Sequence, residues 1–243
     1  RSVLRESDSI SIGELAKSEA EEISFIYNQP LWLGNLWMNE MGKDKTIDLC
    51  AWFNEQPRLT ARINTIKISI EDCLKELQDL GWTVEQDTYI PEVVYINAHQ
   101  GHLEKAKPVI DGHITFMDKA SMLVAHVVDP QPGERILDCC AAPGGKSMHM
   151  ASLMNNTGAI MSCDIYDHKL ELMNQNAERL GVSIVSTKLQ DGRYLPDNWK
   201  EQFDRVLVDA PCSGLGILQK NWICVGVKHN LYLLTYLHYS LKY

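Results

Sequence analysis

The chain has 243 residues, of which 45% are hydrophobic and 23% are charged. This composition excludes a disordered or collagen-like chain, and the length allows two modest domains. The formal net charge of -9 argues against binding nucleic acid by bulk attraction, although a local basic groove is compatible with it. The seven cysteines have neither disulfide nor zinc-knuckle spacing, and no leader or membrane-length apolar run occurs. We therefore expect a cytoplasmic protein with reduced thiols, without a metal or a membrane contact.

The first part of the chain is polar. Residues 1–26 hold too few apolar positions to form a core and are predicted to be a linker. Because residue 1 is Arg rather than Met, we expect the natural protein to begin earlier. Helical spacing of apolar residues then predicts two short helices, at 30–38 and 47–53.

A small α/β module is predicted next. Residues 59–68 alternate between apolar and polar, which indicates a strand with one buried face. A helix should follow, capped by Ser69 with Asp72 at its third position and ended by Gly81. Two more short strands are predicted, at 83–85 and 93–96.

From residue 118 the pattern changes to alternating helices and strands. The first helix is indicated by an apolar stripe made of Ala120, Leu123, Val124, Val127 and Val128. The predicted strands are 135–139, 159–163, 184–187 and 205–208, and the predicted helices between them are 147–154 and 168–180. Such alternation with apolar strands predicts a parallel, doubly wound, Rossmann-like sheet.

In sheets of this kind a ligand binds beyond the carboxyl ends of the strands. The first strand runs into DCCAAPGGK (138–146), whose paired glycines allow a tight turn beside a ligand. Asp164 ends the second strand, 26 residues after Asp138, where a carboxylate can bind ribose hydroxyls; alternatively, it is a solvent-facing strand end. Asp191 follows the third strand and can accept from an adenine amino group, or is only the start of an Asp-Gly turn. Acids at three successive strand ends favour a nucleoside site.

The fourth strand leads into Asp209-Ala-Pro-Cys-Ser-Gly. Methyltransferases that act on exocyclic amines commonly have an aromatic ring here, whereas this chain has the thiol of Cys212. Cytosine C5 becomes nucleophilic only after a thiolate adds to C6 and an acid shares a proton with N3. A thiol and a carboxylate close together are the groups that this chemistry requires. The alternative interpretation is that Cys212 is a small buried hydrophobe.

A phosphate-binding P-loop is the rival interpretation of the glycine turn. Gly145-Lys146-Ser147 before a helix resembles the end of such a loop. However, Cys140 stands where the first glycine is required, and Pro143 removes one backbone donor. The nucleotide triphosphatase therefore stays a minor alternative.

Four segments together resemble the bacterial 16S ribosomal RNA cytosine-5 methyltransferases of the Sun/Fmu type: DCCAAPGGK, the strand end at Asp164, QDGRY and DAPCSGLG. NEQPRLTARIN (54–64) is similar to the start of that family's RNA-binding domain, and the resemblance covers about 27–220. It implies ribosomal RNA processing with S-adenosyl-L-methionine as the cofactor. The implied cofactor-binding residues are Cys140, Ala141, Ala142, Pro143, Gly144, Gly145, Lys146, Asp164, Asp191 and Asp209.

The resemblance also implies that two different cysteines share the catalytic work. In this family Cys212 is implied to help release the enzyme from the methylated base, while the attacking thiol belongs to a later Thr-Cys motif that this sequence lacks. Cys224 follows too closely, with no intervening helix, to replace it. We therefore expect catalytic roles for Cys212 and Asp209, with the main nucleophilic cysteine absent.

The predicted organisation is α/β, truncated at both ends. Its parts are a linker or remnant of an N-terminal helical RNA-binding domain (1–26), a small α/β RNA-binding module (27–117), an incomplete Rossmann-like methyltransferase domain (118–220) and a divergent tail (221–243), which a frameshift would explain. The predicted function is methylation of cytosine C5 in 16S ribosomal RNA, free or in an early small subunit, by a monomer. The alternative is a catalytically inactive RNA-binding fragment.

Overall fold

The structure, a computed structural model, describes residues 16–212, 214–215 and 218. The described residues divide into two compact units, one made of 16–57 with 212, 214–215 and 218, and one running from Arg58 to Pro211. The predicted tail and Cys224 lie outside the described residues. Within the described part, no helix is long and apolar enough to cross a membrane.

The first unit is helical. Its helices are α3 (Glu19–Ile26), α4 (Leu31–Met41) and α5 (Lys43–Asn54), which confirms the two predicted helices. Trp37 and Phe53 stack with ring centroids 5.6 Å apart in a core that also holds Ile23 and Leu33. The expectation that residues before 27 contribute to no core is therefore wrong at α3, because Ile23 is buried. The structure groups α4 and α5 with α3, and the domain boundaries given above stay a prediction.

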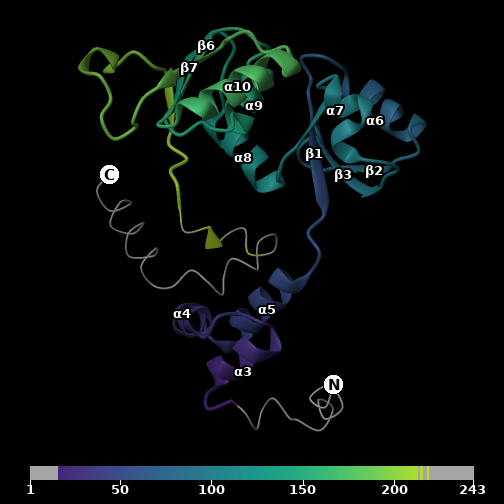
Figure 1. Ribbon diagram of the computed structural model, residues 1–243, viewed down its shortest axis with the longest axis vertical. Helices are drawn as coiled ribbons and strands as arrows, with labels where there is room; N and C mark the ends of the chain where they lie inside the picture. The colour runs from purple at the N-terminus through teal and green to yellow at the C-terminus, as the bar shows by residue number, and fades with distance from the viewer. Residues whose placement is uncertain (1–15, 213, 216–217, 219–243) are drawn as a thin grey trace. The chain divides into compact units, whose positions relative to one another are not determined.

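The second unit contains two sheets, seen in Figure 1 as separate groups of strands. The first is antiparallel, in the order β2-β3-β1-β4. Its strands are β1 (Leu59–Ile63), β2 (Thr83–Gln86), β3 (Val93–Ala98) and β4 (Ile114–Phe116), with helices α6 (Ile70–Asp79) and α7 (Lys107–Ile110). As predicted, Ser69 caps α6, accepting from the Asp72 N–H at 3.1 Å, and Gly81 follows with φ +76°. β4 was not predicted.

The second sheet is parallel throughout, in the order β7-β6-β5-β8, which confirms the predicted Rossmann-like architecture. Its strands are β5 (Arg135–Asp138), β6 (Ala159–Asp164), β7 (Val185–Leu189) and β8 (Arg205–Leu207), with helices α8 (Lys119–Val128), α9 (Gly145–Leu153) and α10 (Asp167–Leu180). Gly181 ends α10 in the left-handed region, as expected from the sequence.

The predicted helix after residue 118 is confirmed as α8, and the apolar stripe that indicated it is not its most buried face. Met122 and Ala125 are buried instead, while Val127 is 82% exposed. The stripe lines an open apolar groove together with Val206 and Leu207 of β8. Helical periodicity identified the helix, but the face that is buried depends on which elements pack against it.

The turn between α7 and β4 approaches the end of α10 closely at Gly112. Gly112 has φ +73°, and a Cβ there would lie 2.2 Å from the Arg179 carbonyl oxygen at the end of α10. Asn64 fixes the same junction, since its side-chain amide donates to the Gly112 and Leu180 carbonyls at 2.9 Å each. Only a glycine allows this backbone contact.

Gly112→Ala is therefore expected to lower the free energy of unfolding by about 3 kcal/mol or more, combining left-handed strain with steric overlap. Gly101→Ala is the matched control, because Gly101 has φ +74° but no atom within 4 Å of the added Cβ. It should lose only about 1–2 kcal/mol from strain. Urea unfolding measures both, and equal losses would contradict the close approach.

Candidate functional site

Four acidic residues lie at the carboxyl edge of the parallel sheet. Asp138 and Asp164 are the last residues of β5 and β6, and Asp191 and Asp209 each follow two residues after β7 and β8. Burial raises the pKa of the Cys140 thiol, and all four carboxylates raise it further, so all four act on one sulfur atom. The sequence-predicted acids are thus brought together at one edge.

Asp138 has a buried carboxylate that is only partly satisfied. Its Oδ2 accepts from Ser147 Oγ at 2.7 Å, and Ser162 Oγ in turn donates to Ser147 Oγ at 2.8 Å. Its Oδ1 has no hydrogen-bond partner among the described residues. Burial raises the pKa of Asp138 to about 6. An unpaired buried carboxylate oxygen beside a glycine turn fits a ligand that brings a donor or a positive charge.

The predicted cofactor loop, Cys140–Lys146, joins β5 to α9. The Ala141 N–H donates to the Cys163 carbonyl at 2.8 Å, so the loop is attached to the end of β6. Gly144 caps α9 with φ +97°, and a Cβ there would lie 3.1 Å from Met173 Cγ. The Ala142-Pro143 peptide bond is cis. The turn therefore places the first N–H groups of α9 at the carboxyl edge, where they can face a polar ligand.

Asp164 and Asp191 sit on the next two strand ends. Asp164 is buried, and its Oδ1 accepts from the Tyr166 N–H at 3.0 Å and lies 3.7 Å from Lys169 Nζ. Asp191 is held by Arg193, whose Nη2 donates to Oδ2 at 2.6 Å. Both carboxylates therefore have fixed directions, the property needed of groups that position a ligand.

Asp209 forms an ion pair with Lys146, which links the end of β8 to the start of α9. Cys212 belongs to the first unit, and its side chain is exposed. The alternative interpretation of Cys212 as a small buried hydrophobe is therefore wrong. Its catalytic role stays a prediction.

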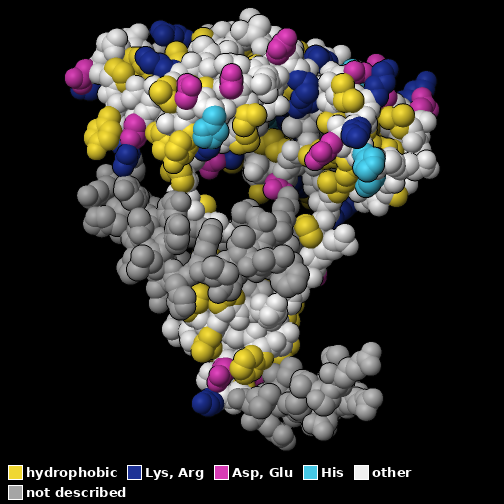
Figure 2. Space-filling view, viewed as in Figure 1, with side chains coloured by type: hydrophobic (Ala, Val, Ile, Leu, Met, Phe, Trp, Pro, Cys, Tyr) yellow, Lys and Arg dark blue, Asp and Glu magenta, His cyan; other side chains and the backbone are white. Residues whose placement is uncertain are grey.

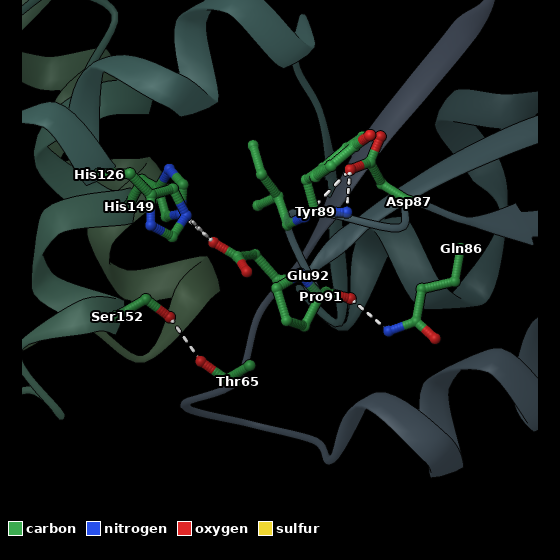
Figure 3. A network of polar contacts seen from close by, with 10 residues as sticks. Thr65, Gln86, Asp87, Tyr89, Pro91, Glu92, His126, His149 and Ser152 are labelled. Atoms are coloured by element: carbon green, nitrogen blue, oxygen red, sulfur yellow. Dashed lines mark hydrogen bonds and ion pairs between the residues drawn. The ribbon is translucent and has the colours of Figure 1, made fainter.

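A second polar cluster in this unit was not predicted from the sequence (Figure 3). Glu92, just before β3, accepts through Oε1 from His126 Nε2 of α8 at 2.6 Å and from His149 Nε2 of α9 at 2.8 Å. Burial alone would raise the pKa of Glu92, but the two imidazoles outweigh it and hold this pKa at about 2. Burial lowers the pKa of His149 to about 4, so this ring is neutral.

The buried guanidinium of Arg62 supplies the charge that balances Glu92. Arg62 is 1% exposed, and its Nε and Nη1 have no hydrogen-bond partner among the described residues. Burial lowers the pKa of Arg62 to about 10, although the negative charge of Glu92 acts to raise it. The three donor atoms of Glu92, His126 and His149 lie within 4.8 Å of one another, as metal ligands do. Because the nearby Arg62 guanidinium already balances the carboxylate and would repel a cation, we interpret the cluster as a buried charge network. His126 of α8 and His149 of α9 join it to Glu92 of the antiparallel-sheet part.

The pKa of Asp138 predicts a stability effect. A carboxyl group whose pKa is raised from 3.8 to about 6 stabilises the folded state at low pH and loses that contribution as the pH rises through 6. The loss amounts to up to about 3 kcal/mol. Asp138→Asn should therefore be more stable than the parent protein at pH 7, with the difference shrinking toward pH 4, in urea unfolding. Asp197→Asn, at a highly exposed carboxylate, is the control. An Asp138→Asn difference that is the same at both pH values would contradict the buried charge.

Charges of both signs are interspersed with apolar side chains on the visible face of the second unit (Figure 2). This agrees with the net charge of -9 and shows no continuous basic surface on that face. A nucleic acid that binds there would contact individual cations and not a uniform positive field.

Comparison with known proteins agrees with this geometry. The family model described as 16S rRNA methyltransferase RsmB/F matches residues 125–230, and that of the RsmF/B-like ferredoxin-like domain matches residues 29–101. The probable ribosomal RNA small subunit methyltransferase B of Bacillus subtilis is 36% identical over 194 residues, covering 79% of this chain and 43% of the relative. The tRNA (cytosine(49)-C(5))-methyltransferase of Pyrococcus abyssi is 33% identical over 185 residues, covering 74% and 57%.

Solved structures give the same fold. The crystal structure of PH0851 superimposes with a TM-score of 0.84 at 30% identity, covering 92% of this chain and 50% of that one. A methyltransferase homologue from Pyrococcus horikoshii gives 0.75 at 26% identity, covering 86% and 68%.

The fold and the strand-end site thus define a Rossmann-like methyltransferase domain joined to a ferredoxin-like module. The chain belongs to the RsmB/F family of ribosomal RNA methyltransferases, whose methyl donor is S-adenosylmethionine, which confirms the predicted family and cofactor class. It spans less than half the length of the bacterial methyltransferase B relatives, 43% and 44%.

Proposed function

We propose that this chain carries the S-adenosylmethionine site of an enzyme that methylates cytosine C5 in 16S ribosomal RNA. The observation that carries the proposal is the set of four carboxylates at one sheet edge, with a buried, unpartnered Asp138 oxygen among them. The names of the bacterial relatives support a ribosomal RNA substrate of the small subunit.

Each residue has a distinct part in holding the cofactor. Asp164 would accept from the ribose hydroxyls, and Asp191 from the adenine amino group. The loop 140–146 and Asp209 would enclose the rest of the cofactor. The unpaired oxygen of Asp138 would accept a hydrogen bond from the cofactor or lie near its positive charge. The bound cofactor supplies a methyl group activated on a sulfonium sulfur; the protein residues orient it and exclude water.

On the target base, Asp209 would share a proton with cytosine N3, and the exposed thiol of Cys212 would assist release of the methylated product. Attack on C6 requires a second thiolate, and no Thr-Cys pair occurs in the printed sequence. We therefore propose that this chain, as it stands, binds the cofactor but does not complete methyl transfer. The proposal includes a monomer in the cytoplasm, acting on free or early-assembled 16S RNA. Free thiols, as the described cysteines have, fit the cytoplasm.

The phosphate-binding alternative is disfavoured by two contacts. A P-loop needs its Ser hydroxyl free to bind Mg²⁺, but Ser147 is buried and donates to Asp138. It also needs a lysine directed at phosphates, whereas Lys146 is paired with Asp209.

A transfer assay with labelled S-adenosylmethionine and unmodified 16S RNA tests the proposal. Cofactor binding without methyl transfer is the expected result, and transfer would show that the chain contains the whole catalytic set. RNA binding without cofactor binding would instead favour the catalytically inactive RNA-binding fragment. Hydrolysis of ATP would revive the P-loop interpretation.

A further inference from the structure

The carboxylate of Asp191 is engaged by a single neighbouring side chain along one edge. Arg193 Nε lies 3.0 Å from both Oδ1 and Oδ2, and Nη2 lies 2.6 Å from Oδ2. The backbone N–H of Arg193 also donates to Oδ1 at 2.9 Å. A guanidinium presents its donors in a rigid plane, so this grip fixes the orientation of the carboxylate.

The grip leaves Asp191 one acceptor position. A carboxylate has about four lone-pair directions, two on each oxygen. Oδ1 accepts from the Arg193 N–H and from Nε, and Oδ2 accepts from Nε and Nη2, so Nε is shared between the two oxygens. Three donor nitrogens thus serve about four lone-pair directions, which leaves one for a ligand.

The turn that carries Asp191 is itself held in place. A Cβ on Gly192 would lie 3.2 Å from Cys139 Cβ, so the turn packs against the end of β5. The Tyr194 N–H donates to the Asp191 carbonyl at 3.0 Å, and Gln190 Nε2 donates to the Tyr194 carbonyl at 2.7 Å. The Asp191 acceptor therefore has a fixed place at the carboxyl edge.

We infer that Arg193 is a positioning residue that makes Asp191 an acceptor-only group with one outward direction, and thereby selects an amino-bearing purine over a carbonyl-bearing one. The inference rests on the proposed function, in which Asp191 faces the base of the cofactor. Adenine offers its amino group to that oxygen. Hypoxanthine would place its carbonyl oxygen there, acceptor against acceptor, and leave Asp191 unpaired.

The protonation of Asp191 supports the same assignment. The Arg193 guanidinium lowers the pKa of Asp191, so the carboxyl group offers no proton to a carbonyl at neutral pH. The ion pair is also partly shielded, with side-chain exposures of 42% for Arg193 and 28% for Asp191.

Calorimetric titration with S-adenosylhomocysteine and S-inosylhomocysteine tests the inference. The parent protein should bind the adenine ligand about 10- to 100-fold more tightly, the size of one hydrogen bond to a charged group. Arg193→Gln should reduce this ratio to a few-fold, and Arg193→Lys should give an intermediate ratio, because it restores the charge without the planar fork. Asp191→Asn should abolish the preference, since its amide can present either an oxygen or an N–H.

Arg58→Gln is the matched control, because Arg58 is half exposed and ion-paired to Glu85 away from this edge. It should keep the parental ratio, and thermal melting should show that all variants remain folded. Equal binding of both ligands by the parent, or a parental ratio in Arg193→Gln, would overturn the role of Arg193 while leaving the proposed function intact. Binding of neither ligand by the folded parent would overturn the proposed function and the inference with it.

Discussion

Replacing Glu92 by glutamine is expected to lower the free energy of unfolding of the second unit by about 3–5 kcal/mol. Glutamine keeps the shape and an oxygen that can accept from His126 and His149, but it removes the charge that balances Arg62. The Arg62 guanidinium is 1% exposed and cannot be hydrated in its place, so the unbalanced charge destabilises the folded state. A loss this large approaches the whole stability of a typical domain.

Urea unfolding of two further variants separates charge from packing. Glu85→Gln removes the partner of Arg58 in an ion pair whose side chains are 50% and 56% exposed, and should cost less than about 1 kcal/mol. The double variant Arg62→Met with Glu92→Gln removes both buried charges and should recover much of the loss. A Glu92→Gln loss no larger than that of Glu85→Gln would show that the Glu92 charge is not needed to balance the buried Arg62.

Asp164→Ala is expected to weaken S-adenosylmethionine binding by about 100-fold or more, because it removes a charged acceptor for the ribose hydroxyls. Asp164 is buried at the end of β6 and directed by the Tyr166 N–H, so water cannot easily replace it. Folding should be retained, since its partner Lys169 is partly exposed.

Asp167→Ala is the control for this measurement. Asp167 begins α10 three residues later and is exposed, so its removal takes away a similar negative charge without touching the strand end. Calorimetric titration of both variants gives the comparison. Equal affinities would show that Asp164 does not bind the ribose of the cofactor.

The parallel sheet and its acids were predictable because both depend on local sequence. Short runs rich in apolar residues mark β5, β6 and β8, and an acid stands at or just after the end of each of the four strands β5 to β8. The Ser69 cap was predictable for the same reason, as the cap and the N–H it binds are three residues apart. The convergence of the acids then follows from parallel topology.

The contacts between the two sheets were not predictable, because they join residues far apart in the chain. His149 and Glu92 are 57 residues apart, and Asn64 reaches the carbonyl of Leu180 across 116. Buried polar residues such as Arg62 interrupt the apolar pattern and leave no periodic signal. β4 was missed for a similar reason, since it has three residues and is defined by pairing with β1.

The orientation of the Asp191 carboxylate was likewise not predictable from the sequence. Its position after β7 follows from the sequence, whereas the orientation that the Arg193 guanidinium gives its carboxylate depends on side-chain geometry. Likewise, the unpaired oxygen of Asp138 follows from burial by tertiary packing.

Amide chemical-shift mapping during titration with S-adenosylhomocysteine tests the central claim, a single nucleoside site at the carboxyl edge of the parallel sheet. The largest changes should occur in three segments that follow successive strands, namely residues 140–146, 164–166 and 191–193. Shifts confined to the antiparallel sheet, or no saturable shifts in a folded sample, would contradict it.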